Sequence, residues 1–595
     1  MIDRSIHSEI IEFLESPISL KEINDELFAR TGIKTFFSSF EKINEFKNFF
    51  YNFNNKNSKK LKELGDFQTP TSLTDKICSL VKKTGFEPDI IIEPTCGAGN
   101  FIISSLKFFD NIKYIYAVEI QPEYEWIFKL NILNFSFQKN ISAEIEFHID
   151  NIFTHKISNR LESFIENRSQ NLLIIGNPPW ITNSALSMLN SRNLPQKFNF
   201  KKYRGIDAIT GKGNFDIAES IILNMIEKFS YSNAKIAMLC KTSVIRNIVK
   251  SMKFFALELS DIKAYTIDSK KEFNISAHAA VLIGNLGKRK GYSCDVYSLY
   301  NEKKYRTFGW FNGKFVSNIE EYKKHKYIDG NSPFIWRSGI KHDAAKVMEL
   351  RVFGESSFRN GLDEIVTFNN KELIYPFLKG SQLREPIVTE TSKRIIITQS
   401  YPSENTAYIK YDYPEIWEYL SKHSNLLSNR KSSIYKDKSE FSIFGVGEYS
   451  FKPYKIAISA LYKKPQFSLV LPFMNKPVML DDTCYFISFD ELSIAVYAWI
   501  LLYSDEVYNF LNSIVFEDTK RPYTKEILMR IDLSKLILKT SFDDLRNIYN
   551  NNLKKYFLYE LSEIEYENFI ETIMKIKNEQ NKLYFNSNQK EKLLI

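Results

Sequence analysis

Seven short β-rich runs alternate with helix-length spacers between residues 89 and 286, and this alternation constrains the fold more than any other feature of the chain. The runs are DIIIEP (89–94), YIYAVEI (114–120), EIEFHID (144–150), NLLIIGN (171–177), AKIAMLC (234–240), IKAYTID (262–268) and AAVLIGNL (279–286). Strands separated by helices form βαβ units and a mostly parallel, twisted sheet. Several runs are apolar throughout, as strands buried on both faces are. The pattern therefore predicts an α/β domain with a doubly wound, Rossmann-like sheet.

The chain has 595 residues, which is too many for one hydrophobic core, because single cores stop growing near ~250–300 residues. We expect a helical N-terminal extension over 1–60, the α/β domain over 61–290, a connector over 291–330 and a separate α+β domain over 331–595. The last domain carries the β-like runs ELIYPFL, RIIITQ, YKIAISAL and FSLVLPF, and helical segments follow after about residue 540. Residues 181–213 form a long basic spacer without a helical period, which is typical of a functional lid or of a disordered segment.

The charge and cysteine content exclude some classes of protein. The net charge of +9 is compatible with a polyanionic partner but is mild for so long a chain. The five cysteines lie far apart without a CxxC pair, so neither a zinc ribbon nor a disulfide framework is expected, and we predict no metal site. The N-terminus lacks an apolar signal core, and the longest apolar run, Ser493 to Tyr503, is shorter than the ~20 residues that cross a bilayer. These features favour a protein of the bacterial cytoplasm.

A glycine turn follows the first predicted strand, in the segment Thr95-Cys96-Gly97-Ala98-Gly99-Asn100-Phe101. Gly97 and Gly99 allow a ligand close to the backbone, and the next helix directs its N-terminal amides at that ligand. The third glycine of a dinucleotide fingerprint is absent, because Ile102 occupies that position, so a nicotinamide site is not expected. Glu119 and Asp150 end the next two strands, where they suit ribose hydroxyls and an exocyclic amine. The alternative is a tight strand-to-helix turn without a ligand.

The tetrapeptide Asn177-Pro178-Pro179-Trp180 follows the fourth strand, at the edge where open α/β sheets bind ligands. The prolines fix the backbone and remove donors, Asn177 adds a carbonyl acceptor, and Trp180 adds a flat apolar face. The nitrogen lone pair of an aromatic amine is delocalised into its ring. Acceptance of both N–H protons by the Asn177 side chain and the Pro178 carbonyl restores that lone pair for attack on a methyl group. The alternative is a proline turn with a core tryptophan.

The ordered motifs resemble those of S-adenosylmethionine-dependent amino-methyltransferases, most closely DNA adenine-N6 methyltransferases of the gamma arrangement. In that family an F-x-T-P element precedes the glycine motif and then N-P-P-[YFW]. Here Phe67-Gln68-Thr69-Pro70, Glu93 to Phe101 and Asn177 to Trp180 follow in that order. Two further segments, Gly213-Asn214-Phe215-Asp216 and Glu272-Phe273-Asn274, are similar to its fifth and eighth motifs. Glu93 replaces the more frequent Asp and Trp180 the commoner Tyr, and both replacements preserve the chemical role.

The resemblance implies roles for individual residues. Phe67, Thr69 and Pro70 would close over the methionine part of S-adenosylmethionine, while Glu119 would bind its ribose and Asp150 its adenine. The middle of the cofactor would be held by Glu93, Thr95, Gly97 and Gly99, with Asn100, Phe101, Ile120 and Asn151 completing the cofactor-binding set. Asn177, Pro178, Pro179 and Trp180 would form the catalytic segment. Trp180 and Phe273 would stack on opposite sides of a flipped-out base.

The implied function is site-specific methylation of adenine N6 in duplex DNA, as the modification enzyme of a restriction-modification system. Duplex DNA is then the partner, and by analogy a separately encoded restriction endonuclease is another. The C-terminal domain would recognise the target, since its window 422–464 holds nine Lys or Arg residues against three acids, interleaved with aromatic residues. A second basic cluster is Lys520-Arg521-Pro522-Tyr523. The alternative is a solvated surface with core aromatics.

Other functions stay open. An N-P-P-x site also occurs in methyltransferases of guanine N2 in RNA and of glutamine in protein, although these usually lack the F-x-T-P element. A fused restriction-modification enzyme would need a cryptic nuclease in the C-terminal half. A DNA-binding subunit with a vestigial pocket is a third alternative, which the intact glycine and N-P-P motifs disfavour.

Overall fold

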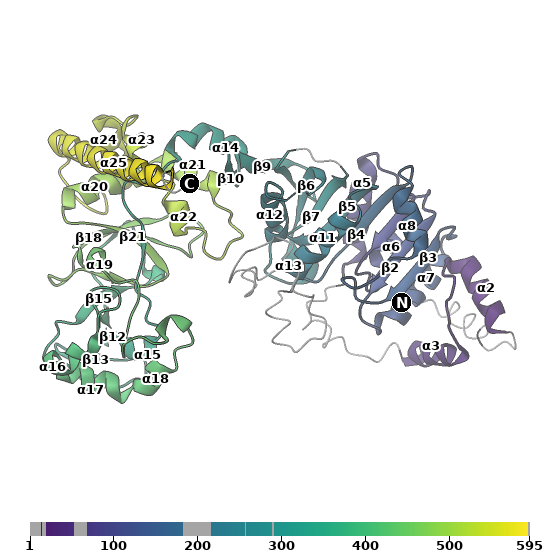
Figure 1. Cartoon of the computed structure of the whole chain (residues 1–595), viewed down its shortest axis with the longest axis horizontal. Helices are drawn as coiled ribbons and strands as arrows, with labels where there is room; N and C mark the ends of the chain where they lie inside the picture. The colour runs from purple at the N-terminus through teal and green to yellow at the C-terminus, as the bar shows by residue number, and fades with distance from the viewer. Residues whose placement is uncertain are drawn as a thin grey trace. The chain divides into compact units, whose positions relative to one another are not determined.

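The computed structural model describes residue 14 and residues 19–52, 68–181, 216–255, 257–287 and 291–592. The chain divides into two compact units, Met1–Phe315 and Val316–Ile595. Among the described residues, a ten-stranded sheet belongs to the first unit and ends at the boundary, while a five-stranded and a six-stranded sheet belong to the second (Figure 1). The boundary between the units falls inside the range 291–330, which the sequence assigns to a connector.

All seven predicted strands of the first unit are present. They are β1 (Ile90–Glu93), β2 (Tyr114–Glu119), β3 (Glu144–Ile149), β4 (Asn171–Gly176), β5 (Asn233–Lys241), β6 (Leu259–Ile267) and β7 (Ala279–Leu286). Their order in the sheet is β6-β7-β5-β4-β1-β2-β3. The pairs from β5 through β3 are parallel, and β7 is antiparallel to both of its neighbours. This arrangement confirms the mostly parallel sheet.

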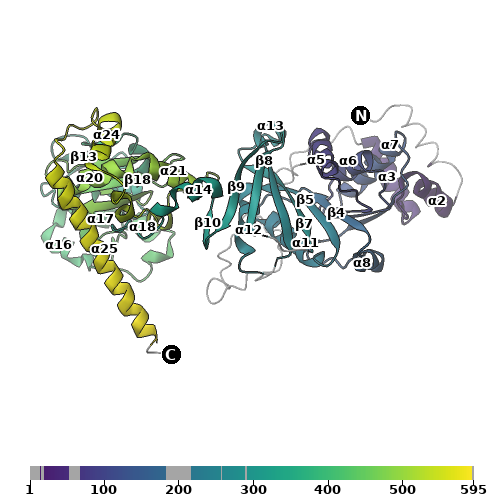
Figure 2. The ribbon, with the colours of Figure 1, turned by 90° about the horizontal axis from the view of Figure 1, so that it is seen from above.

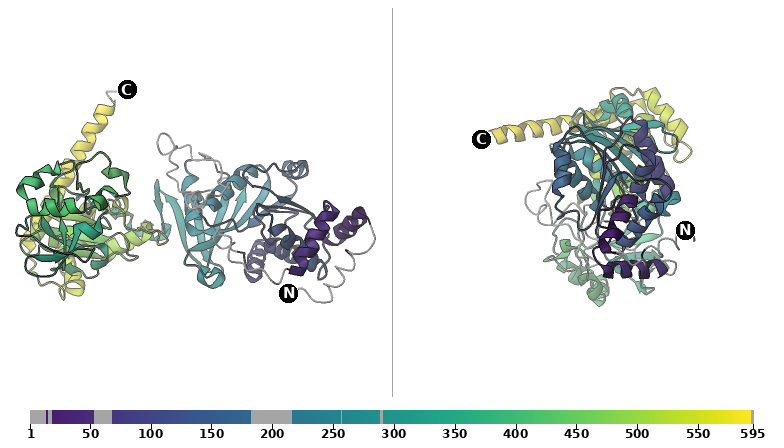
Figure 3. Two further views of the ribbon diagram at one scale, coloured as in Figure 1. Left: turned by 90° about the horizontal axis from the view of Figure 1, so that it is seen from below. Right: turned by 90° about the vertical axis from the view of Figure 1, so that its right-hand side faces the viewer.

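Helices cover both faces of this sheet. Figure 2 shows α5 (Thr71–Lys83), α6 (Asn100–Phe108) and α7 (Tyr124–Ser136) on one face, and α8 (Asn159–Glu166), α11 (Ile217–Lys228) and α12 (Thr242–Ser251) on the other. Figure 3 gives two further views of the ribbon. Every residue of β1 and β2 is buried as a result. The sheet is therefore doubly wound. Its continuously apolar strands are buried on both faces, as the sequence pattern indicates.

Three more strands extend the sheet beyond β6. They are β8 (Ser293–Ser298), β9 (Lys304–Phe311) and β10 (Lys314–Val316), and a short helix, α13 (Ser269–Phe273), lies between β6 and β7 in the chain. β8 is parallel to β6, and β9 is antiparallel to β8. The sequence predicts a connector over 291–330, whereas the structure places the first part of that range in the sheet. These strands carry partly exposed, charged side chains, so they lack the apolar runs that identify most of the seven predicted strands.

The helical N-terminal extension is present among the described residues as α2 (Leu20–Thr31) and α3 (Phe40–Asn52). It packs against the sheet domain and lies within the first unit. The rings of Phe37 and Phe46 contact Trp126 of α7, with centroids 6.0 and 5.6 Å away. A bridge between Ile33 and Ile145 joins the extension to β3. Aromatic packing therefore fixes this segment beside the sheet.

The second unit is α+β, as the sequence predicts for this part of the chain. Its five-stranded sheet has the order β11 (Arg337–Ser338), β21 (Cys484–Phe489), β18 (Tyr454–Ser459), β19 (Phe467–Val470), β16 (Ile387–Val388). Its six-stranded sheet has the order β14 (Ile365–Thr367), β13 (Ser357–Arg359), β12 (Glu349–Val352), β17 (Lys393–Ile396), β15 (Ile374–Leu378), β20 (Met479–Leu480). The four predicted β-like runs coincide with β15, β17, β18 and β19.

Helices complete the second unit. The longer ones are α17 (Pro414–Lys422), α20 (Leu492–Leu502), α21 (Asp505–Ile514), α24 (Phe542–Asn552) and α25 (Glu563–Lys592). The shorter ones are α14 (Ile319–His325), α15 (Ala345–Met348), α16 (Ile409–Asp412), α18 (Ser424–Ser428), α19 (Glu448–Phe451), α22 (Lys525–Leu528) and α23 (Leu533–Ile537). The long apolar run of the sequence forms α20, which is buried from Ala495 to Leu502. Of the helices that the structure describes, none has the length and apolar character that a membrane span requires.

Candidate functional site

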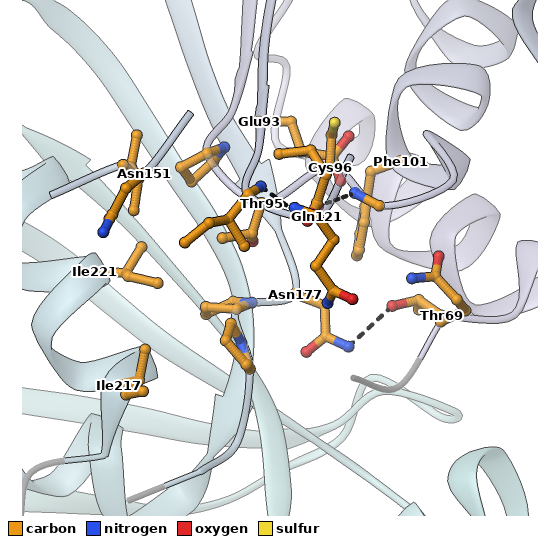
Figure 4. A pocket seen from close by; sticks show the side chains of 18 of the residues that line it. Thr69, Glu93, Thr95, Cys96, Phe101, Gln121, Asn151, Asn177, Ile217 and Ile221 are labelled. Atoms are coloured by element: carbon orange, nitrogen blue, oxygen red, sulfur yellow. Dashed lines mark hydrogen bonds between the residues drawn. The ribbon is translucent and has the colours of Figure 1, made fainter. Parts of the chain in front are cut away.

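A cleft lies at the carboxyl ends of β1 to β4, with an empty volume of about 1110 Å³ that includes the space open to solvent (Figure 4). Its lining combines apolar side chains with convergent polar groups, as ligand sites do. The predicted residues that line it are Thr69, Glu93, Thr95, Gly97, Asn100, Phe101, Glu119, Ile120, Asp150, Asn151, Asn177, Pro178 and Pro179. Four other predicted residues, Pro70, Gly99, Trp180 and Phe273, do not line it. Phe67 lies outside the described residues.

The glycine turn forms the floor of the cleft between β1 and α6. Gly97 and Gly99 have φ values of +49° and +81°, which residues with a Cβ rarely adopt. A Cβ at Gly97 would lie 2.6 Å from the Gln68 side chain, and one at Gly99 would lie 2.8 Å from the Phe128 ring. Both glycines are thus required by conformation, and Gly99 also by space, because the flexible Gln68 amide can move away from a Cβ at Gly97.

Glu119 holds this turn in place. Its Oε2 accepts a hydrogen bond of 2.8 Å from the Gly97 amide, and its Oε1 accepts bonds of 2.9 Å from the Ile120 and Gln121 amides. The carboxylate therefore joins the end of β2 to the glycine turn that follows β1. The sequence predicts a ribose-binding role for Glu119, and that role stays a prediction.

Two buried polar atoms at the cleft identify where a ligand fits. Glu93 Oε2 and Thr95 Oγ1 are buried and have no hydrogen-bond partner among the described residues. Burial, reinforced by the nearby charge of Glu119, raises the pKa of Glu93 well above its usual value. Buried polar groups normally have partners, so these atoms fit a polar ligand that supplies them. A cationic group near Glu93 would also lower the cost of ionising it.

Thr69 joins the three sequence motifs by hydrogen bonds. Its hydroxyl accepts a bond of 3.1 Å from Asn177 Nδ2, and its carbonyl accepts one of 2.8 Å from Asn100 Nδ2. The preceding residue, Gln68, accepts a bond of 3.1 Å from the Ala98 amide. The F-x-T-P, glycine and N-P-P-W segments therefore surround one cleft, as Figure 4 shows for Thr69 and Asn177.

The chain beyond Pro179 is held from the neighbouring strand. Lys241, the last residue of β5, donates a hydrogen bond of 2.9 Å to the Trp180 carbonyl and one of 2.6 Å to Asp216 Oδ2. The Ile217 amide donates a bond of 2.9 Å to the Ile181 carbonyl. Burial raises the pKa of Asp216, although the Lys241 ammonium opposes this shift. These contacts fix the backbone that carries Trp180.

Trp180 and Phe273 lie together but do not form an open slot. Their ring centroids are 5.3 Å apart at an interplanar angle of 68°, and the Trp180 side chain is buried. A base between two parallel rings needs a centroid separation of about 7 Å, because each stacked contact spans about 3.5 Å. The structure thus brings the two predicted residues into contact, and a base can enter between them only after they separate.

Asp150 follows the last residue of β3 and lines the cleft. Its Oδ2 accepts a hydrogen bond of 2.7 Å from His155 Nδ1, and its Oδ1 accepts one of 2.7 Å from the Asn151 amide. The bond from His155, the largest contribution, holds the pKa of this carboxyl below its usual value. Asp150 is therefore an ionised acceptor in the cleft.

Sequence reasoning missed several residues of the site. The lining also includes Gln68, Pro94, Cys96, Gln121, Ile152, Phe153, Ile181, Ile217 and Ile221. Ile217 and Ile221 are one helical turn apart on α11, a spacing that could have identified an apolar wall. Lys241 follows a strand at the ligand-binding edge, which was a usable signal. His155 carried no local signal. Of the predicted segment 213–216, only Asp216 is described, and the predicted lid lies outside the described residues apart from Ile181.

Many cations of the 422–464 window are used within the second unit. Arg430 donates to the Leu427 and Ser442 carbonyls at 2.7 Å and lies 3.7 Å from the Tyr435 ring centroid. Lys455 is buried, and Phe441 belongs to the core. In the second cluster, Tyr523 is buried too. Structural roles therefore account for much of this pattern. The exposed lysines of the loop after Arg430 are Lys431, Lys436 and Lys438.

The chain is similar to a protein family, to a characterised relative and to solved structures. Residues 24–252 match the family model described as N-6 DNA Methylase. The type II methyltransferase M.NspV from Nostoc sp. is 40% identical over 477 residues, which cover 80% of this chain and 97% of M.NspV. A structure of the type IIL restriction-modification enzyme MmeI in complex with DNA has 13% identity and a TM-score of 0.45, covering 85% of this chain and 75% of MmeI. The type IIG restriction endonuclease BpuSI has 13% identity and a TM-score of 0.34, covering 86% of this chain and 65% of BpuSI.

Proposed function

Because the chain belongs to the N-6 DNA methylase family, we propose that its cleft methylates the N6 amine of an adenine flipped out of duplex DNA. The protein is an S-adenosylmethionine-dependent DNA methyltransferase, and its relatives are consistent with a restriction-modification system. The observation that carries the residue-level proposal is the meeting of the three motifs at Thr69. A cofactor beside the glycine turn and a base beside Asn177 would then share one cleft.

The cofactor-binding residues suit a positively charged nucleoside derivative. Glu93 Oε2 and Thr95 Oγ1 are buried acceptors that a ligand can satisfy. Asp150 is an ionised acceptor suited to the exocyclic amine of adenine. Bound S-adenosylmethionine supplies an electrophilic methyl group. The chain's own residues bind and orient it. Because Glu93 is buried, we expect the floor of the cleft to exclude water.

Asn177 and Pro178 activate the target amine. The Asn177 Nδ2 group donates to Thr69, so its amide oxygen is the atom that can accept from an N–H group. The Pro178 carbonyl, fixed by two consecutive prolines, accepts the second N–H. This acceptance localises the lone pair on nitrogen for attack on the methyl group. Acceptors placed for a transition state contribute roughly 10²–10³ in rate.

Trp180 and Phe273 would stabilise the extruded adenine. Extrusion costs a few kcal/mol, and stacking on an aromatic ring returns about 1–3 kcal/mol per base. The edge-to-face contact between the two rings would have to open when the base enters. Lys241 would keep the Trp180 backbone in place during this change, because it binds the Trp180 carbonyl.

Target recognition is assigned to the second unit. Lys431, Lys436 and Lys438 are exposed in one loop, where they would contact phosphates. A separately encoded restriction endonuclease would be the functional partner, as the family resemblance implies. The protein would act in the bacterial cytoplasm, where its DNA substrate lies.

Transfer of label from tritiated S-adenosylmethionine to duplex DNA tests the function, with N6-methyladenine as the expected product. Asn177→Ala should lower the rate of transfer by about 10²–10³-fold while leaving cofactor affinity nearly unchanged. Asn247→Ala is the matched control, because it removes a hydrogen bond of 2.8 Å to Glu219 between two helices. Methylation-sensitive sequencing of DNA from expressing cells would return the target sequence.

Three results would contradict the proposal. Label in RNA or protein instead of DNA would favour the guanine or glutamine methyltransferases. Cleavage of DNA with Mg²⁺ would favour a fused nuclease. Equal activity of Asn177→Ala and the wild type would remove Asn177 from the catalytic segment.

A further inference from the structure

A buried chain of hydrogen bonds supports Asp150 from behind the cleft. His155 Nδ1 lies 2.7 Å from Asp150 Oδ2, and the His155 side chain is buried. The other ring nitrogen, Nε2, bonds to the hydroxyl of Tyr116 on β2. Asp150 directly follows β3, so this chain connects two neighbouring strands beneath the wall of the cleft.

The acid–base character of the partners determines the direction of each hydrogen bond. An ionised carboxylate only accepts, so the proton between Asp150 and His155 lies on Nδ1. In the neutral imidazole Nε2 is then an acceptor, and the Tyr116 hydroxyl donates to it. Every polar atom of the imidazole therefore has a partner.

The neighbouring backbone and rings restrict His155 further. Its amide donates a hydrogen bond of 2.8 Å to the Asn151 carbonyl, which turns the chain back beneath Asp150. Its ring lies 5.7 Å from that of Tyr116 and 4.9 Å from that of His148. His148 is itself bonded to Glu146 at 2.8 Å. Rotation of the imidazole away from Asp150 would disturb this packing.

We propose that His155 is a positioning residue that holds the Asp150 carboxylate for the exocyclic amine of the cofactor's adenine. The Asp150 side chain is 47% exposed, so without a fixed donor it can rotate into solvent. A carboxylate held in the cleft favours a 6-amino group, which donates, over a 6-carbonyl group, which only accepts. His155 thereby contributes to selection of adenine over hypoxanthine. This inference rests on the proposed adenine-binding role of Asp150.

The test compares the affinities of S-adenosylhomocysteine and S-inosylhomocysteine, measured by calorimetry on the full-length protein. The wild type should prefer the adenine ligand by about tenfold or more. His155→Leu should reduce that preference about fivefold, because leucine fills space but donates no hydrogen bond. His155→Asn should restore most of it, because its Nδ2 can occupy the position of the lost donor. His325→Leu is the matched control, because it removes a histidine–glutamate contact of 3.1 Å in the second unit, and it should keep the preference.

The outcomes separate the two proposals. If His155→Leu weakens both ligands equally, His155 has only a structural role and the inference is overturned. If Asp150→Asn leaves the preference unchanged, Asp150 does not read the amine, and the proposed adenine-binding role fails first. A loss of preference in Asp150→Asn and His155→Leu, with recovery in His155→Asn, supports both.

Discussion

Replacement of Lys241 by methionine should destabilise the first unit, and more so at alkaline pH. The Lys241 ammonium lies 2.6 Å from the Asp216 carboxylate, and Asp216 is only 8% exposed. Methionine retains much of the side-chain volume but removes the positive charge. Asp216 is then left as a buried carboxylate without its cation, while the Trp180 carbonyl loses a donor.

The magnitude follows from the burial of the pair. Loss of one partner of a buried ion pair costs about 3–5 kcal/mol. The Lys241 side chain is 26% exposed, so solvent screens part of its interaction, and we expect about 2–3 kcal/mol. The loss cannot exceed about 5 kcal/mol at pH ~7.5, because Asp216 can bind a proton instead of remaining charged. Protonation costs about 1.36 kcal/mol for each pH unit above a normal pKa near 3.9. For a unit of this size the expected loss corresponds to a decrease in Tm of about 3–5 °C.

The sign of the pH dependence follows from the direction of the pKa shift. Burial raises the folded-state pKa of Asp216 even with Lys241 present, and removal of Lys241 raises it further. A group with a raised folded-state pKa stabilises the fold below its unfolded pKa, and this contribution is lost as the pH rises through the folded value. The Tm deficit of Lys241→Met should therefore be larger at about pH 8 than at about pH 5.

Differential scanning calorimetry at both pH values measures this deficit. The double variant Lys241→Met with Asp216→Asn is the control, because a neutral amide removes the buried charge. We expect the double variant to regain part of the lost stability at the higher pH. A deficit that is equal at both pH values, or a double variant no more stable than the single one, would refute the reasoning.

Two other predictions concern the glycine turn and the second unit. Gly99→Ala should destabilise the protein more than Gly85→Ala and should weaken the binding of S-adenosylhomocysteine. Both residues have positive φ, but of the two only Gly99 has an atom within 3 Å of an added Cβ. Equal unfolding transitions of the two variants would contradict a close approach at Gly99. A variant with alanine at Lys431, Lys436 and Lys438 should reduce the slope of log K for DNA binding against log salt concentration by about 2–3. An unchanged slope would exclude phosphate contacts at these lysines.

The sequence predicts the inner sheet well because those strands are buried on both faces. All four residues of β1 and all six of β2 are buried, so their apolar runs stand out from the flanking helices. β8 and β9 are different, because they lie toward the edge of the sheet and include exposed or half-exposed positions such as Lys304 and Tyr305. Their signal is weaker, and the sequence therefore predicts a connector where the sheet continues.

Site residues that belong to a contiguous motif could be predicted from the sequence. Contacts that form only in the folded chain could not. The motif residues Gly97, Glu119 and Asn177 line the cleft as expected. Lys241 acts on the Trp180 carbonyl through the folded chain, whereas His155 lies only 5 residues after Asp150 and reaches it through a turn that no motif marks. Trp180, one of the partners of Lys241, is 61 residues away in the sequence, so the place of Lys241 at the ligand-binding edge signals a site residue but does not identify this contact.

The negative charge of the cleft disfavours a dinucleotide as the ligand of the glycine turn. Among the described residues that line it, Glu93, Glu119 and Asp150 are acidic and none is Lys, Arg or His. A pyrophosphate would be repelled by the carboxylates of Glu119 and Asp150. A ligand with a sulfonium and an ammonium group would be attracted by them and would also favour ionisation of the buried Glu93. Methyl transfer removes the positive charge from sulfur, so the product is attracted less strongly than the cofactor. In the proposed cofactor site, the same acidic wall would thus favour binding before the reaction and release after it.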